Sequence, residues 1–499
     1  MRTAAIFSDR MVLQRDKPIT VWGDGENGAR VTVTLAGQSA SCTVTDGKWR
    51  VTLPPMPAAE HLTMTVQSGT EQITFHDVAV GEVWLCGGQS NMEFEIRNEK
   101  NGRALLDSLT PDCGVRFYYT PKQRIIDADF DKTERNTCWN TASPETSGAW
   151  SAVGLYFALE LQKKLGVTVG LIGCNWGGTT ASAWVPRETL AAHPALHPYL
   201  DDYDSAMQGK TDAQHIAEYD EYLAYQDKWY ADYTKLMAEH PETSWEQAQD
   251  ILGPSRYPGP MGPKNELRPG GLYETMLRRV CPYTLRGFLY YQGESDDHRP
   301  DTYAELLEAL IQRWRSDWGD DALPFLNVQL PMFRYRHEPD YKHWCRIRDA
   351  QMQVYRKLRH TGLAVLTDCG ELDNIHPTDK APVGHRLCLQ ALCEVYHRLP
   401  RAAACAPQYR AHYASGGVMT VLCDHAAEGW MLKGEPCCFE LAGADGEFHP
   451  ANAAFAPNRI TLTADEVPQP EAVRYAWSNY AEVTVFGRNG LPLAPFSTV

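Results

Sequence analysis

The feature that most constrains the fold is a set of short apolar segments, several of them followed by a polar turn that contains glycine. These segments are residues 83–86, 167–172, 287–291, 324–330 and 363–367. Wholly apolar runs of this length are typical of strands that are buried on both faces of a sheet. Between them lie stretches with helical apolar spacing, at 151–164, 303–314 and 344–357. This alternation predicts an α/β fold whose parallel sheet is covered by helices on both faces.

The two ends of the chain follow a different pattern. Residues 1–80 alternate apolar and polar side chains, which is typical of half-buried strands. Within them, Asp46-Gly47 predicts a hairpin turn between residues 44–45 and 48–53. The last hundred residues are again strand-like. We therefore expect an N-terminal β-sandwich at 1–80, the α/β domain at 81–400 and a C-terminal β-rich domain at 401–499.

An acidic helical insertion interrupts the α/β domain around residues 195–262. Residues 201–250 hold 13 aspartates and glutamates against 3 lysines, so most of the chain's net charge of −16 lies here. Tyrosines and other apolar residues recur in this stretch at helical spacing, which predicts one or two amphipathic helices. We interpret the tyrosine stripe as packing in preference to a sugar-binding surface.

The charge of the chain limits its partners. With 47 basic and 63 acidic residues, no basic surface is expected for nucleic acid or for an anionic membrane. No apolar run approaches the ~18 residues of a membrane span, and the N-terminus lacks the apolar core of a signal peptide. We expect a cytoplasmic protein, with a secreted form that has lost its signal as the alternative. The pattern does not predict an oligomeric state.

The 14 cysteines are scattered, many of them in apolar segments, as reduced core thiols would be. None forms a CxxC pair, and the adjacent Cys437 and Cys438 would point to opposite faces of a strand. A structural zinc site is therefore not expected.

The turn after residues 83–86 places Ser90 at the carboxyl end of a central strand, the edge at which open α/β sheets carry their sites. A serine hydroxyl is a poor nucleophile near neutral pH, so it needs a base, and the base needs an orienting carboxylate. His376 and Asp373, three residues apart, can supply both. Together they predict a triad. Taken alone, the pair could also be a capping aspartate, a surface histidine or half of a metal site.

Two further turns offer donors for an oxyanion. Residues 175–180 (NWGGTT) could supply a backbone N–H, and residues 291–295 (YQGES) a side-chain amide. A tetrahedral intermediate of acyl transfer needs such fixed donors. Each motif could instead be only a tight turn between a strand and a helix.

Residues 88–92 (GQSNM), 176–179 (WGGT), 291–295 (YQGES) and 373–377 (DNIHP) closely resemble blocks I, II, III and V of the SGNH hydrolases, in the variant found in sialate O-acetylesterases and related carbohydrate acetylesterases. The resemblance runs nearly end to end, because it includes residues 7–14, 328–331 and 490–492. It implies a three-layer, flavodoxin-like core. The chain departs from the family at 181–184 and 271–276, which leaves the chemistry unchanged and the substrate fit open.

The resemblance also implies roles for single residues. The triad would be Ser90, Asp373 and His376, and the oxyanion hole would consist of the Ser90 and Gly177 backbone N–H groups and the Gln292 side chain. Glu294 is the alternative acid, since some related esterases use the block III glutamate. No metal or organic cofactor is implied.

The implied reaction is removal of O-acetyl groups from a small sugar or glycan, with O-acetylated sialic acid as the first choice of substrate. Acetylated xylan or another polysaccharide is the alternative substrate, and a catalytically inactive carbohydrate-binding protein is the alternative of another class. Gln89, Trp184 and Arg348 are candidate substrate-binding residues, with Trp184 as a possible apolar wall and Arg348 as a partner for a carboxylate. A core tryptophan and a structural ion pair are the competing interpretations of these two.

Overall fold

A computed structural model describes residues 1–240, 243 and 245–499. The protein is of the mixed α/β class and contains several sheets. It forms two compact units: unit 1 consists of residues 1–121, 133–181 and 279–499, and unit 2 of residues 122–132 and 182–278. Within the described ranges, no helix has both the length and the apolar character needed to cross a bilayer.

The central sheet of unit 1 has the strand order β10-β9-β11-β8-β12-β13-β14. All neighbouring strands are parallel except β10, which runs antiparallel to β9. The predicted α/β class is thus confirmed, and the predicted buried strands lie in this sheet. Their bounds are β8 Glu71–Gly88, β9 Val115–Tyr119, β10 Asn140–Thr141, β11 Val169–Asn175, β12 Gly287–Tyr291, β13 Phe325–Gln329 and β14 Thr361–Val365.

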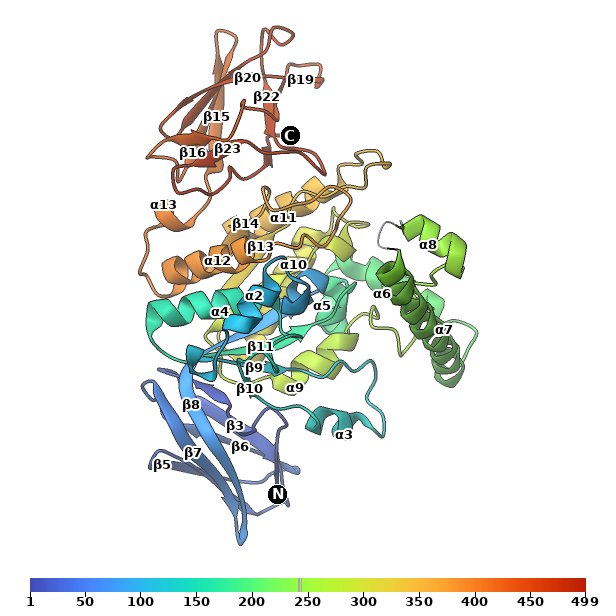
Figure 1. The fold of residues 1–499 in the computed structure, drawn as a ribbon, viewed down its shortest axis with the longest axis vertical. Coiled ribbons are helices and arrows are strands. Elements are labelled where there is room, and N and C mark those ends of the chain that lie inside the picture. Colours follow the sequence, from blue (N-terminus) through green and yellow to red (C-terminus); the bar gives the residue numbers. More distant parts are fainter. Residues whose placement is uncertain (241–242, 244) are drawn as a thin grey trace. The chain divides into compact units, whose positions relative to one another are not determined.

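Helices cover both faces of this sheet. Adjacent residues of a strand point to opposite faces, and in β8 Cys86 faces Gly154 whereas Gly87 faces Trp314. Gly154 belongs to α4 (Ala152–Leu165) and Trp314 to α10 (Tyr303–Trp318), so these two helices lie on opposite sides. α12 (Ala381–Gln390) packs beside α4, and α11 (His343–Lys357) beside α10 (Figure 1).

Strand β8 connects the N-terminal strands to the central sheet. Figure 1 shows it as one long strand, and its 18 residues continue without a break past residue 80. Its first part pairs with β7 (Ala59–Ser68) and β2 (Val12–Gln14), and its last part with β11 and β12. The N-terminal region and the α/β region therefore share a strand.

The remaining N-terminal strands form two groups. β4 (Arg30–Leu35) pairs with β5 (Gln38–Thr43) and with β7. β1 (Arg2–Thr3), β3 (Ile19–Asp24) and β6 (Lys48–Leu53) form a separate three-stranded sheet. The turn predicted at Asp46-Gly47 is confirmed, because Thr45 and Lys48 exchange two backbone hydrogen bonds across it, whereas the rest of β6 pairs with β3. The turn residues specify the reversal and not the partner strand.

The C-terminal residues form three small antiparallel sheets around an apolar core that includes Phe439, Ile460 and Tyr475. Their strands are β15 Gln408–Ser415, β16 Val418–Asp424, β17 Trp430–Leu432, β18 Phe439–Ala442, β19 Phe448–Pro450, β20 Asn452–Ala456, β21 Arg459–Thr463, β22 Ala472–Tyr475, β23 Val485–Gly487 and β24 Phe496–Ser497. The predicted boundaries at residues 80 and 400 stay predictions.

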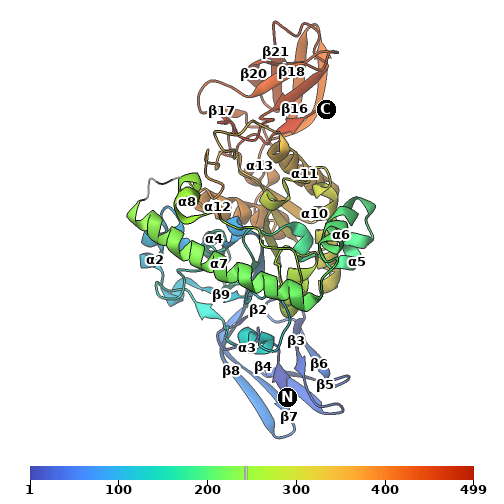
Figure 2. The same ribbon diagram turned by 90° about the vertical axis from the view of Figure 1, so that its right-hand side faces the viewer.

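The acidic stretch of unit 2 is helical, as expected. It contains α6 (His197–Ala206), the 28-residue α7 (Asp212–Glu239) and α8 (Trp245–Leu252) (Figure 2). The Tyr219 hydroxyl donates to Glu266, and the Tyr222 ring lies so close to Gly259 that a Cβ there would be 2.4 Å away. These two tyrosines are buried and serve packing, in agreement with the expected role of the stripe.

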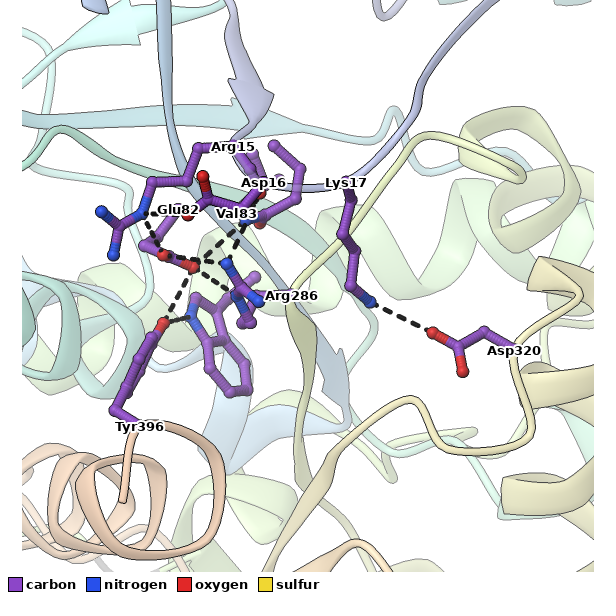
Figure 3. Close-up of polar contacts among 10 residues, drawn as sticks. Arg15, Asp16, Lys17, Glu82, Val83, Arg286, Asp320 and Tyr396 are labelled. Atoms are coloured by element: carbon purple, nitrogen blue, oxygen red, sulfur yellow. Dashed lines mark hydrogen bonds and ion pairs between the residues drawn. The ribbon is translucent and has the colours of Figure 1, made fainter. Parts of the chain in front are cut away.

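A buried carboxylate lies at the amino end of the central sheet. Glu82 is fully buried in β8, and it accepts hydrogen bonds from Arg15 Nε at 2.6 Å, from Arg286 Nε at 2.7 Å and from the Tyr396 hydroxyl at 2.9 Å (Figure 3). Gln14 also donates to it, at 3.2 Å. The cluster thereby joins the N-terminal strands, the strand before block I, the start of β12 and the segment after α12.

We predict that Glu82→Gln lowers the free energy of unfolding by about 3 kcal/mol, the low end for a broken buried ion pair, because it leaves two partly buried guanidinium groups without their counter-charge. Burial acts to raise the pKa of Glu82, but the hydrogen bonds and charges of Arg286 and Arg15 outweigh it and hold that pKa below its ordinary value. The stabilisation is therefore present above the pKa of an unfolded glutamate and is lost as the pH falls through the lowered one. Urea unfolding as a function of pH measures both effects.

Glu71→Gln is the matched control. Glu71 lies at the exposed start of the same strand, and its one ion pair among the described residues is with the N-terminal ammonium group, so its loss should cost about 0–1 kcal/mol. Equal losses in the two variants would contradict the role of Glu82.

Candidate active site

The turn after β8 is held by the two neighbouring strands. Gly88 has φ +131°, and a Cβ there would lie 2.0 Å from the Tyr291 carbonyl oxygen, so only glycine fits. The Gly88 carbonyl accepts from Trp176 N, and the Tyr291 carbonyl accepts from Gln89 N, both at 3.1 Å. The ends of β8, β11 and β12 are thereby locked together, and the next residue, Ser90, begins the short helix α1 (Ser90–Glu93).

Ser90 and His376 are brought together from positions 286 residues apart. His376 lies in the loop between β14 and α12, and its Nε2 is 2.8 Å from Ser90 Oγ. Burial, followed by the charge of Lys380, lowers the pKa of His376 to about 4, while Glu93 opposes the change. The imidazole is therefore neutral near pH 7 and can accept the serine proton.

Asn91 ties the loop of His376 to the serine turn. Its side-chain amide donates to the Ile375 carbonyl at 2.9 Å and to Glu294 Oε1 at 2.7 Å, while its own Oδ1 accepts from Lys380 Nζ. Asn91 follows Ser90 directly and Ile375 precedes His376 directly. Each hydrogen bond of this buried amide therefore fixes the backbone next to a reacting side chain.

The predicted acid, Asp373, is not in contact with His376 in this structure. Its carboxylate accepts from the Arg336 backbone N–H and, at 3.1 Å, from Arg336 Nε, and the side chain is 41% exposed. Among the described residues, no hydrogen bond joins it to the imidazole. The spacing of three residues places Asp373 and His376 in the same loop, but it does not bring the carboxylate to the imidazole.

The alternative acid, Glu294, also lies apart from the imidazole. Its Oε1 accepts from Asn91, and Oε2 is buried with no hydrogen-bond partner among the described residues. Burial raises the pKa of Glu294 to about 7, with the Asn91 hydrogen bond and the charge of Lys380 working in the opposite direction. Glu294 is thus a member of the buried Asn91 cluster.

The predicted oxyanion donors differ in whether their N–H groups already have a hydrogen-bond acceptor. Ser90 is the first residue of a helix, where backbone N–H groups have no intrahelical partner. The Gly177 N–H lies beside the nucleophile, because a Cβ on Gly177 would be 3.2 Å from Ser90 Cβ. In this structure it donates to Glu93 Oε2 at 2.7 Å. A substrate oxygen would have to replace that carboxylate.

Gln292, the third predicted donor, has no free N–H group. The side chain is fully buried, its Nε2 donates to Asp296 and to the Thr179 carbonyl, and its Oε1 accepts from the Tyr303 hydroxyl at 2.8 Å. The position fits a residue that holds blocks II and III together. The structure thus argues against the oxyanion role that the resemblance implies for this side chain.

The three candidate substrate-binding residues are buried. Gln89 is bonded to Ser295 through both ends of its amide. Trp184 is 0% exposed, which favours the interpretation as a core tryptophan over that as a sugar wall. Arg348 is also 0% exposed and donates to the carbonyl groups of Ser478, Asn479 and Pro331, so it fastens α11 to the C-terminal region. This burial and these carbonyl partners argue against a substrate carboxylate as the partner of Arg348.

One group of described side chains could offer three ligands to a metal ion. The ligand atoms of Cys393, Glu394 and Cys405 lie within 4.8 Å of one another. Burial raises the pKa of the Cys393 thiol to about 12, and Glu394 pairs with Arg401 at 2.9 Å. These features favour protonated thiols and a carboxylate that is already neutralised. The group includes none of the residues around Ser90.

Comparisons with known proteins point to carbohydrate esterases. Residues 263–393 match the family model described as carbohydrate esterase, sialic acid-specific acetylesterase. The chain is 27% identical to the sialate O-acetylesterase of Mus musculus, over 99% of this chain and 94% of that protein. The human sialate O-acetylesterase is also 27% identical, over 79% of this chain and 71% of that protein.

A solved structure agrees over the whole chain. A carbohydrate acetylesterase from Xanthomonas citri superposes with a TM-score of 0.79 at 28% identity, covering 100% of this chain and 99% of that one. The chain is thus similar to sialate O-acetylesterases and to a carbohydrate acetylesterase. The resemblance drawn from the four motifs is thereby confirmed.

Three residues of this esterase site were not predicted as functional from the sequence. Asn91 and Glu93 stand one and three residues after the nucleophile, within or beside block I, and Lys380 stands four residues after His376. Their proximity to the two motifs was the available signal. Short-range spacing did not indicate that Asn91 and Lys380 would be buried in contact with each other.

Proposed function

We propose that the protein is a serine esterase that hydrolyses O-acetyl esters on sugars, with Ser90 as nucleophile and His376 as general base. The observation that carries this proposal is the 2.8 Å hydrogen bond between Ser90 Oγ and His376 Nε2 at the carboxyl edge of the sheet. Similarity to carbohydrate esterases and sialate O-acetylesterases supports the reaction class.

In the proposed mechanism, Ser90 Oγ attacks the acetyl carbonyl carbon while its proton passes to His376 Nε2. The tetrahedral intermediate collapses as His376 returns that proton to the departing sugar oxygen, which leaves an acetyl-serine. A water molecule, deprotonated by the same imidazole, then attacks the acetyl group, and the imidazolium returns that proton to Ser90 Oγ as the acetyl–serine bond breaks and acetic acid leaves, to ionise to acetate in solution. The net reaction consumes one water and yields acetate and a sugar hydroxyl.

The oxyanion is assigned to the backbone N–H groups of Ser90 and Gly177. Both donors come from turns whose conformation is fixed by hydrogen bonds between strands, so they are preorganised. The Gly177 donor is available once the substrate carbonyl takes the place of Glu93 Oε2. Gln292 supports the site from behind by joining Thr179 and Asp296.

We also propose that the core is of the SGNH type. Without the edge strands β10 and β9, the order β11-β8-β12-β13-β14 reads 2-1-3-4-5 in chain order, which is the flavodoxin-like arrangement. The serine turn follows the first strand, next to the point where the strand order reverses, and ligands of open α/β sheets bind there.

O-acetylated sialic acid is the proposed substrate, because the matching family model and the mammalian relatives carry that specificity in their descriptions. The relative from Xanthomonas citri is described only as a carbohydrate acetylesterase. Acetylated xylan-type sugars are therefore the second candidate.

Ser90→Ala should abolish hydrolysis of p-nitrophenyl acetate and of an O-acetylated sugar, with a loss of about 10⁶ in kcat, because no other group forms the acyl-enzyme. Thermal unfolding should be nearly unchanged, since the side chain is small and only partly buried. Retention of a tenth of the activity would exclude the proposed nucleophile.

The acid that orients His376 is predicted to be Asp373. Its exposed side chain lies on the same loop and can leave Arg336, whereas Glu294 is enclosed by the Asn91 cluster. Asp373→Asn should therefore lower kcat more than Glu294→Gln, with both variants compared under saturating p-nitrophenyl acetate. A larger loss in the glutamate variant would reverse the assignment.

The choice of substrate is tested by kcat/KM on 9-O-acetylated sialic acid and on acetylated xylo-oligosaccharides, with Ser90→Ala as the blank for each. We expect the higher value for the sialic acid. Clear preference for the xylo-oligosaccharides would leave the general acetylesterase proposal standing and remove the specific one.

A further inference from the structure

A buried lysine lies behind the Ser90–His376 pair. Lys380 is 1% exposed, and it precedes α12 directly. Its Nζ donates to Asn91 Oδ1 and lies 4.7 Å from the ring centroid of Phe94 and 5.8 Å from that of Tyr291. An ammonium group in such surroundings is costly unless specific partners compensate the loss of water.

The partners of Lys380 come from several elements. The acidic groups that act on its charge are Glu294, Glu371, Cys369 and Glu99, in that order. Burial lowers the pKa of Lys380 to about 8 despite them, so the group is still mainly protonated at pH 7. At neutral pH the site thus contains a mainly protonated ammonium group that the proposed mechanism does not use.

The contacts of Lys380 lead directly to the two reacting side chains. The ammonium holds the oxygen end of the Asn91 amide, and the nitrogen end of that amide is then directed to the Ile375 carbonyl and to Glu294. If the amide were turned by 180°, its NH₂ group would face an ammonium and its oxygen would face a carbonyl and a carboxylate. Lys380 therefore selects one orientation of Asn91.

We propose that Lys380 is a positioning residue of the esterase: through its hydrogen bond to Asn91 it fixes the turn of Ser90 against the loop of His376. This inference rests on the proposed serine-esterase function. Lys380 touches no reacting atom, so its effect is exerted through Asn91 and through the electric field at His376.

The charge has a definite consequence for the base. The charged groups that act on His376 are Lys380, which favours the neutral ring, and Glu93, which favours the protonated ring. Removal of the lysine charge should therefore raise the pKa of His376 above its present value of about 4. With Lys380 in place, the imidazolium formed during attack gives its proton readily to the departing sugar oxygen.

Two neutral variants separate the charge from the hydrogen bond. Lys380→Gln removes the charge and keeps an N–H donor for Asn91, whereas Lys380→Met removes both. The pH profile of kcat/KM on p-nitrophenyl acetate should have an acid limb near pH 4 in the wild type. It should move up by about one pH unit in both variants, and at pH 7 only the methionine variant should lose about tenfold or more in kcat/KM.

Lys100→Met is the control. Lys100 pairs with Asp379 at 3.4 Å at the edge of the same loop, but its side chain is 60% exposed and has no contact with Asn91. It should leave both the acid limb and the rate unchanged. Lys380→Arg, which keeps the charge, should retain the wild-type acid limb whatever its rate.

An NMR titration of the His376 imidazole, assigned with His376→Asn, measures the same shift without any substrate. It tests Lys380 even if the wild type hydrolyses no ester, so failure of this inference is distinguishable from failure of the proposed function. If Lys380→Met does not fold, Lys380→Gln decides the matter. An imidazole pKa and an acid limb equal to those of the wild type in Lys380→Gln would overturn the proposal.

Discussion

The fold depends on the compensation of one buried negative charge. Glu82 lies inside β8, where a lone carboxylate would be strongly unfavourable, and it is tolerated because Arg15, Arg286 and Tyr396 reach it from three separate parts of the chain (Figure 3). Loss of any one of these partners would leave a buried charge of the cluster incompletely compensated. The cluster thereby fixes the amino end of the strand whose carboxyl end, six residues further on, leads into the serine turn.

At the active site, buried polar groups are compensated by hydrogen bonds between turns and by one side-chain amide, and not by a cluster of ion pairs. At the carboxyl edge of the sheet, backbone hydrogen bonds join the turns: the Gly88 carbonyl accepts from the Trp176 N–H, and the Tyr291 carbonyl accepts from the Gln89 N–H. These hydrogen bonds leave the side chains of block I free to face the loop before α12. Buried polar groups are then paired through Asn91, which serves a carboxylate, an ammonium and a backbone carbonyl at once. The Glu82 cluster fixes the amino end of the strand, and the Asn91 hydrogen bonds fix the turns at its carboxyl end. Together they place Ser90 and His376 at hydrogen-bond distance.

Local patterns predicted the elements of the core well. The apolar run at 287–291 has the same bounds as β12, and the turn motifs contained both Ser90 and His376. Failures occurred where the decisive partner is distant in sequence. Arg348 was assigned to a substrate carboxylate, but its carbonyl partners at Ser478 and Asn479 lie about 130 residues away. Similarly, β6 pairs with β3, and Asp373 is engaged by Arg336. The periodicity of a sequence indicates which residues are buried, but it does not indicate which distant groups form their hydrogen bonds.

The hydrogen bond from Gly177 to Glu93 has a consequence for turnover. In the resting protein, a carboxylate of the chain already occupies a donor that the proposed reaction needs for its oxyanion. Acetate, the product, is also a carboxylate, and it meets an internal competitor for the same N–H group as soon as it forms. Because Glu93 is tethered, its effective concentration is high and independent of the surroundings. The tethered carboxylate of Glu93 therefore competes for this N–H group with the substrate carbonyl and with acetate alike.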